Sequence, residues 1–275
     1  IAYGDGSHAE GRETAASGSY SHTEGYLTVA SGSYSHAEGN STVASADYSH
    51  AEGFTTIASG TYSHAEGTNS KAYGDSSHAE GYNTETYNTA SHAEGFITYA
   101  YARGSHSEGG STNAYGEFSH AEGSLAITYG NSSHAEGYNT EASGTFSHAE
   151  GSNTKTYGMG SHAEGASSET HAAYSHAEGH NSKTYGPYSH AEGNLTTTFA
   201  GYSHAEGEIT EAGQYLFNGN IVDNTFILNI PGIDLSSYSN FPINVYNFYN
   251  PYTYPVRYDV LSVTYDVDSQ KSYFH

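Results

Sequence analysis

Histidine and glutamate, two residues apart, recur with a fixed spacing along most of the chain. The pentad Ser-His-Ala-Glu-Gly first occurs at residues 7–11 and returns every 14 residues, without insertion or deletion, up to residues 203–207. Thirteen of the fifteen copies are identical, and Thr23 and Ser107 replace the alanine in the other two. An imidazole beside a carboxylate can form charge-assisted hydrogen bonds, bind a metal ion or exchange protons.

Three interpretations of this repeated pair compete. We favour a structural polar seam that fixes the register of associated chains. Metal binding is the alternative, because histidine and glutamate two apart on a strand can both reach one ion and imidazole suits Zn, Ni and Cu; the metal itself stays unknown. Catalysis is disfavoured, because fifteen identical acid–base pairs do not make a single active site. We therefore expect no catalytic residue, no cofactor and no enzyme activity.

The remainder of each 14-residue unit predicts the elements that must hold the pair. Its consensus is Ser-His-Ala-Glu-Gly-x-x-Thr-x-Ala-x-Gly-x-Tyr. A fixed period of this kind favours a solenoid with one unit per turn. Two strands of about five residues with Gly-rich turns fill such a turn, and turns stacked at roughly 4.8 Å make a rod about 70 Å long. We predict an all-β fold, with a 14-residue-repeat parallel β-roll over residues 1–212.

Alternation along each strand predicts which side chains face inward. In the first strand serine, alanine and glycine share the inner side, and histidine and glutamate share the outer side. In the second strand threonine, alanine and glycine face inward, and the variable ninth and eleventh positions face outward. Such a core of small residues buries little apolar area. Burial stabilises by about 25 cal/mol per Å², which is little against backbone-ordering costs of ~1–2 kcal/mol per residue. Association with further copies of the chain would supply the missing burial.

The invariance of histidine and glutamate indicates where those copies meet. Side chains that face water can vary from one turn to the next. Side chains that contact the same environment in every turn are expected to stay the same. We expect that environment to be the same face of symmetry-related chains, in a homotrimer or, as the less favoured alternative, a dimer. The predicted axial polar ladder comprises His8, Glu10, His22, Glu24, His36, Glu38, His50, Glu52, His64, Glu66, His78, Glu80, His92, Glu94, His106, Glu108, His120, Glu122, His134, Glu136, His148, Glu150, His162, Glu164, His176, Glu178, His190, Glu192, His204 and Glu206.

Charge and composition exclude several classes of partner and site. The formal charge is −23, from 30 acidic and 7 basic residues with the 18 histidines neutral. So acidic a chain repels nucleic acid and anionic lipid, and no apolar run approaches the roughly 20 residues of a membrane span. The chain has no cysteine, which excludes disulfides, thiolate metal sites and cysteine nucleophiles.

The ladder also predicts a pH response. Protonating all fifteen ladder histidines would move the net charge from −23 to −8. If pairing outweighs burial, the pKa of histidine rises from about 6.5 and that of glutamate falls from about 4.3. Stability would then peak between those two values, although burial opposes both shifts.

The repeat resembles a known pattern. The pentad followed by x-x-Thr-x-Ala-x-Gly is similar to the head repeat of trimeric autotransporter adhesins of the YadA type, which reads Ser-Val-Ala-Ile-Gly-x-x-Ala-x-Ala-x-Gly. The resemblance covers residues 1 to about 212 and implies a left-handed parallel β-roll assembled as a trimer. Histidine and glutamate stand where that family places the valine and isoleucine that face the trimer interior, which implies a polar interior here.

The pentad also resembles arrays in phage tail-fibre proteins, some of which are linked to self-cleaving C-terminal domains. Together the resemblances imply an extracellular fibre, on a virion tail or a bacterial surface, that attaches to a glycan or protein receptor of a cell. The alternative is a fibre with a glycan-degrading or self-processing activity in or beyond its C-terminal module. Ile1 aligns with Lys71, inside a repeat, so we expect the chain to be a piece of a longer polypeptide.

Aromatic residues form columns of their own in the repeats. The eleventh position carries tyrosine in five consecutive units and the fourteenth in four: Tyr73, Tyr87, Tyr101, Tyr115 and Tyr129; Tyr20, Tyr34, Tyr48 and Tyr62. We interpret both columns as stacked packing, with a sugar-binding stripe as the alternative. Ice binding is disfavoured, because the threonine column points inward.

The repeat pattern stops near Gly213, and residues 213–275 predict a small C-terminal β module, with an incomplete module as the alternative. Glycine becomes rare there, and the apolar runs 226–230 and 260–265 favour strands. A crowded aromatic stretch favours buried packing, with a ligand-binding surface as the alternative. The candidate ligand-binding aromatics are Tyr246, Phe248, Tyr249, Tyr252 and Tyr254.

Overall fold

The computed structural model describes residues 1–212 in full and, beyond them, the backbone of six short strands between residues 219 and 274. The chain divides into two compact units, Ile1–Gln214 and Tyr215–His275. The predicted aromatics Tyr246, Phe248, Tyr249, Tyr252 and Tyr254 lie outside the described residues.

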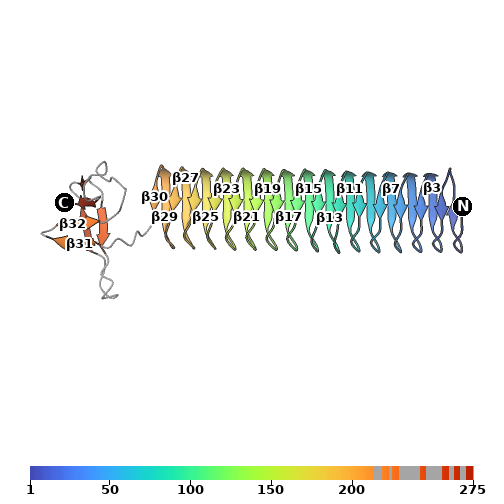
Figure 1. The fold of residues 1–275 in the computed structure, drawn as a ribbon, viewed down its shortest axis with the longest axis horizontal. Coiled ribbons are helices and arrows are strands. Elements are labelled where there is room, and N and C mark those ends of the chain that lie inside the picture. Colours follow the sequence, from blue (N-terminus) through green and yellow to red (C-terminus); the bar gives the residue numbers. More distant parts are fainter. Residues whose placement is uncertain are drawn as a thin grey trace. The chain divides into compact units, whose positions relative to one another are not determined.

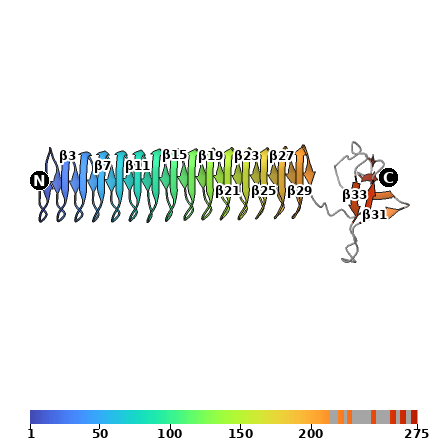
Figure 2. The same cartoon turned by 180° about the vertical axis from the view of Figure 1, so that it is seen from behind.

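The first unit is a parallel β-solenoid in which each 14-residue unit makes one turn, here called a rung (Figure 1). Each rung contributes one strand to each of two fifteen-stranded parallel sheets, and the reverse view shows the same unbroken stack (Figure 2). Strands pair with the equivalent residues one rung on, for example His78 with His92 and Glu80 with Glu94. The predicted all-β solenoid with a 14-residue period is confirmed.

The odd-numbered strands form the first sheet. Their bounds are β1 (His8–Ala9), β3 (His22–Tyr26), β5 (His36–Asn40), β7 (His50–Phe54), β9 (His64–Thr68), β11 (His78–Tyr82), β13 (His92–Phe96), β15 (His106–Gly110), β17 (His120–Ser124), β19 (His134–Tyr138), β21 (His148–Ser152), β23 (His162–Ala166), β25 (His176–His180), β27 (His190–Asn194) and β29 (His204–Glu208).

The even-numbered strands form the second sheet and are only two residues long, shorter than the five expected. Their bounds are β2 (Ala15–Ala16), β4 (Val29–Ala30), β6 (Val43–Ala44), β8 (Ile57–Ala58), β10 (Lys71–Ala72), β12 (Glu85–Thr86), β14 (Tyr99–Ala100), β16 (Asn113–Ala114), β18 (Ile127–Thr128), β20 (Glu141–Ala142), β22 (Lys155–Thr156), β24 (Glu169–Thr170), β26 (Lys183–Thr184), β28 (Thr197–Thr198) and β30 (Glu211–Ala212).

The core between the two sheets consists of small side chains. Alanines such as Ala37 and Ala44 are 0% exposed, and so is the threonine column that includes Thr42. Buried serine hydroxyls donate to the turn that precedes them, as Ser21 Oγ does to the Gly18 carbonyl at 2.7 Å. Because so narrow a core accepts only alanine, serine and threonine, the larger side chains of each rung are left on the outer faces.

The pentad glycine differs from its predicted inward orientation. Gly109 is exposed and has φ +102°, and a Cβ on it would lie 2.2 Å from the carbonyl oxygen of Gly123 in the next rung. Both the left-handed backbone and this close approach exclude a side chain. The pentad glycine is therefore required by the spacing of the rungs and contributes nothing to the core.

Every rung contains a further left-handed residue at its seventh position, and this residue is never glycine. Examples are Leu27 (φ +55°) and Ile97 (φ +58°). A branched residue in this region is strained. The Leu27 N–H donates to the Arg12 carbonyl of the neighbouring rung at 3.1 Å, and this bond repeats along the stack. Contacts between rungs thus hold a conformation that isolated rungs would avoid.

The second unit is antiparallel. Four strands form one sheet in the order β31-β32-β36-β35, and two form another, β33-β34. Strands β32 and β35 overlap the two apolar runs predicted as strands. The bounds are β31 (Gly219–Val222), β32 (Thr225–Leu228), β33 (Pro242–Val245), β34 (Val256–Asp259), β35 (Val263–Asp266) and β36 (Lys271–Phe274). In the described part of the chain, no helix has the length and apolar character of a membrane span.

Candidate functional site

The outward side of the odd-numbered strands carries histidine and glutamate in every rung, and we call it the ladder face. Alanine and serine point into the core between them, so alternation along the strand directs both polar side chains outward. From His36 to His190, the side chains in ion-pair contact expose between 32% and 37% of the histidine and 34% to 44% of the glutamate. Even in one chain these groups are therefore more than half covered.

The imidazole rings stack along the whole ladder face. From His22 to His204 successive ring centroids lie 4.5–4.9 Å apart, and the planes differ by at most 11°. Only the terminal pair, His8 and His22, is tilted, by 47°. This spacing is that of adjacent parallel strands, so the register of the sheet enforces the stack.

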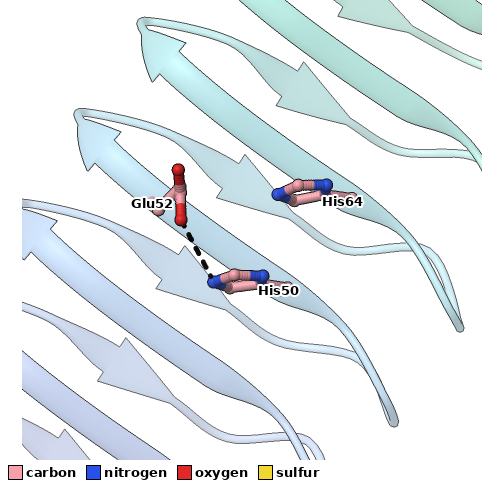
Figure 3. A group of neighbouring side chains, drawn as sticks. All are labelled: His50, Glu52 and His64. Atoms are coloured by element: carbon pink, nitrogen blue, oxygen red, sulfur yellow. Dashed lines mark ion pairs between the residues drawn. The ribbon is translucent and has the colours of Figure 1, made fainter.

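Most ladder histidines contact the glutamate of their own rung. In twelve rungs the Nε2 atom lies 3.3–4.0 Å from the glutamate Oε2 atom. The same carboxylate also approaches the next rung, as in the 4.0 Å from Glu108 Oε2 to His120 Nε2. Figure 3 shows His50, Glu52 and His64: the two rings are parallel, and the Glu52 carboxylate lies beside them in ion-pair contact with His50.

The hydrogen bonds expected within these pairs do not form in most rungs. Thirteen ladder histidines, from His22 to His190, have an Nε2 atom that is shielded from solvent and has no hydrogen-bond partner. Stacking fixes the ring plane, so the nitrogen lies near the carboxylate without aiming at it. The ladder therefore holds a column of buried, unsatisfied nitrogen atoms beside a column of carboxylates.

The pKa shifts have the opposite sign to those expected from pairing. Burial, and then the neighbouring imidazoles, lower the pKa of eight ladder histidines, in His106 to about 4. Burial and the flanking glutamates raise the pKa of the Glu66 carboxyl. In the single chain pairing does not dominate for these residues, because desolvation and like-charge repulsion outweigh attraction to carboxylates that they contact without hydrogen bonds.

The ladder face also groups metal-ligating atoms. The ligand atoms of His50, Glu52 and His64 all lie within 4.8 Å of one another, and eleven such groups occur in the described residues. The five groups that begin at His50, His64, His78, His92 and His106 each combine two imidazoles from neighbouring rungs with the carboxylate of the first rung. This donor set suits zinc and similar transition metals.

The outward side of the even-numbered strands, with the eleventh position beyond them, carries unlike residues in different rungs, and we call it the variable face. The predicted tyrosine column from Tyr73 to Tyr129 stacks with centroids 4.5–5.5 Å apart. The column from Tyr20 to Tyr62 stacks at 4.8–5.1 Å. Both columns lie on the surface of the single chain.

Two features of the variable face were not predicted from the sequence. After Ser143 the aromatic column resumes through Tyr157 and His171 to Phe199, with centroids 4.6–5.7 Å apart. At the ninth position opposite charges alternate over the four rungs from Glu141 to Lys183, and Lys155 Nζ lies 3.4 Å from Glu141 Oε2. The signal for both is present in the sequence: the eleventh position is aromatic again beyond Ser143, and the ninth position carries charges of alternating sign.

No protein-family model matches the chain, and a search of curated proteins gives no match. The fold and the ladder geometry therefore carry the functional argument.

Proposed function

We propose that the repeat region is the rod of an extracellular, non-enzymatic trimeric fibre, which spaces an attachment region from its base. The observation that carries this proposal is the ladder face, which keeps one chemistry over fifteen rungs while the variable face does not. The repeat, which resembles that of YadA-type adhesins and of phage tail fibres, supports the same role. Such fibres belong to a bacterial surface or a virion tail.

The shielded Nε2 atoms support the trimeric part of the proposal. Thirteen Nε2 atoms on this face are shielded from water and have no hydrogen-bond partner. Donors or acceptors from another copy of the chain would satisfy them and so stabilise the assembly. Since every rung offers the same groups at the same spacing, the same face of another copy meets them in register. A three-fold axis beside the ladder face satisfies this condition in every rung at once.

Removing whole rungs tests the rod role. Deletion of residues 63–104 removes three units and joins two positions that are consecutive in the repeat. We expect the shortened chain to assemble like the full chain, with a rod shorter by roughly 14 Å, three strand spacings, in electron micrographs. A deletion that abolishes folding or assembly would contradict a modular spacer.

Attachment is tested on cells. Labelled full-length fibre should bind to a bacterial or host cell surface, and the three-rung deletion should bind with the same affinity because it changes only the reach. Loss of binding in the deletion variant would place the receptor site within the deleted rungs, and would contradict a rod that only spaces.

A further inference from the structure

We propose that the ladder face binds divalent transition-metal ions, each held by two histidines of neighbouring rungs and the glutamate of the first of these rungs, as in His50, Glu52 and His64. The site is intrinsic to one chain, so it does not depend on the trimer proposed above. Zinc is the ion whose preferred ligands match this donor set best.

The distances between ligand atoms fit such an ion. Two ligands of a tetrahedral ion with bonds of about 2.0–2.1 Å lie roughly 3.4 Å apart. His50 Nε2 and Glu52 Oε2 are 3.6 Å apart, and in His106 and Glu108 the same atoms are 3.4 Å apart. This separation is long for a hydrogen bond and suits an ion bridging the two atoms.

The second histidine comes from the next rung. Glu108 Oε2 lies 4.0 Å from His120 Nε2, and Glu150 Oε2 lies 3.9 Å from His162 Nε2. The rings are parallel, so a small rotation of each about its side-chain bonds turns both nitrogens toward the ion. Two imidazoles and one carboxylate leave a fourth position for water or for a group of another copy.

Hydrogen bonding and charge favour the same occupant. The Nε2 atoms of thirteen ladder histidines have no hydrogen-bond partner, so no hydrogen bond competes with a metal ion for them. The ladder glutamates form a column of acidic groups one strand spacing apart. A divalent ion bound between two rungs neutralises the carboxylates of both.

The proposal limits the number of ions. Neighbouring groups share a histidine, so each filled site uses two of the fifteen ladder histidines and at most seven ions bind per chain. Filling should follow alternate rungs, because a bound ion consumes the histidine needed by the adjacent site.

Two variants of the full chain, each with seven His→Gln substitutions, test this arrangement. The alternating variant leaves no two ladder histidines in adjacent rungs, whereas the block variant leaves eight in consecutive rungs. The alternating variant changes His22, His50, His78, His106, His134, His162 and His190. The block variant changes His8, His22, His36, His50, His64, His78 and His92.

Zinc uptake after chelator treatment, measured by calorimetry with Zn²⁺ alone, should reach several and at most seven ions in the wild-type chain. The block variant should keep about four sites, and the alternating variant should bind zinc at least tenfold more weakly. Mg²⁺, which prefers oxygen ligands, should bind to none of them in this way. No zinc uptake by the wild type, or equal uptake by the two variants, would overturn the proposal.

A second measurement on the unaltered chain guards against misfolded variants. Cu²⁺ at low loading should give an electron paramagnetic resonance spectrum with couplings to two nitrogen atoms. Coupling to a single nitrogen would overturn the shared site.

Discussion

The ladder face and the variable face belong to the same rungs, yet they follow different rules. Both lie outside the same alanine, serine and threonine core, and both stack residues at the spacing of the sheet. The ladder face repeats histidine and glutamate without exception, whereas the variable face changes from valine to lysine, glutamate and tyrosine. The fold therefore tolerates variety on one outer face, and we attribute the uniformity of the ladder face to the contact with other copies proposed above.

Glycine substitutions should give the largest contrast between a fixed and a variable position. Gly109→Ala places a Cβ 2.2 Å from the Gly123 carbonyl oxygen at φ +102°, so we expect a loss of about 3 kcal/mol in the free energy of unfolding. Its neighbour is the matched control, since a Cβ on Gly110 has no atom nearer than 4.0 Å. Gly110→Ala should be neutral or stabilise by about 0.5 kcal/mol. Chemical denaturation measures both, and equal effects would contradict the assigned role of the pentad glycine.

Substitutions in the ladder should come next. We expect His92→Val and His106→Val, combined with Glu94→Ile and Glu108→Ile, to be tolerated or stabilising, because packed apolar residues replace unsatisfied polar ones. The two histidine changes alone should cost about 1–2 kcal/mol, because they leave half-covered carboxylates without the stacked imidazoles.

The control for the ladder lies on the variable face. Lys155→Ala breaks the 3.4 Å ion pair with Glu141 and should cost about 0.5 kcal/mol or less, as a partly exposed pair does. Thermal melts of the four-residue ladder variant, the histidine-only variant and Lys155→Ala compare their stabilities. A histidine-only variant that melts no lower than the Lys155 variant would contradict the special status of the ladder face.

The pH response should sum the contributions of the eight ladder histidines whose pKa is lowered. Because the histidine pKa is lowered in the folded chain, the unfolded chain binds more protons between about pH 4 and pH 6.5. Stability should therefore be full above pH 6.5 and fall as the pH decreases through this window, with no maximum in mildly acidic solution. Melts from pH 4 to 8 in the presence of chelator measure it, and a melting temperature that rises on acidification would restore the pairing interpretation.

A last pair of substitutions concerns the core that both faces share. The Thr42 hydroxyl is buried without a hydrogen-bond partner, whereas Thr86 Oγ1 donates to Ser77 Oγ at 2.9 Å. Thr42→Val should stabilise by about 1 kcal/mol, and Thr86→Val should destabilise by about the same amount. Denaturation midpoints that move in the same direction would contradict this assignment of hydrogen bonds.

The period and alternation of the sequence were enough to predict the parallel solenoid, its small core and the outward placement of histidine and glutamate. They could not predict the role of the pentad glycine, because its φ angle and its approach to the next rung belong to the three-dimensional stack. They also left open whether pairing or burial sets the pKa of His106, since the sequence specifies neither the burial of the stacked rings nor the direction of the neighbouring carboxylate.

The central claim is that the ladder face of each chain is covered by the same face of other copies. Sedimentation equilibrium of the full chain, with and without chelator, tests it most directly. The account predicts an assembly of three times the chain mass of 29.2 kDa that persists on dilution. A stable particle of one chain mass, with the histidines and glutamates open to water, would contradict it.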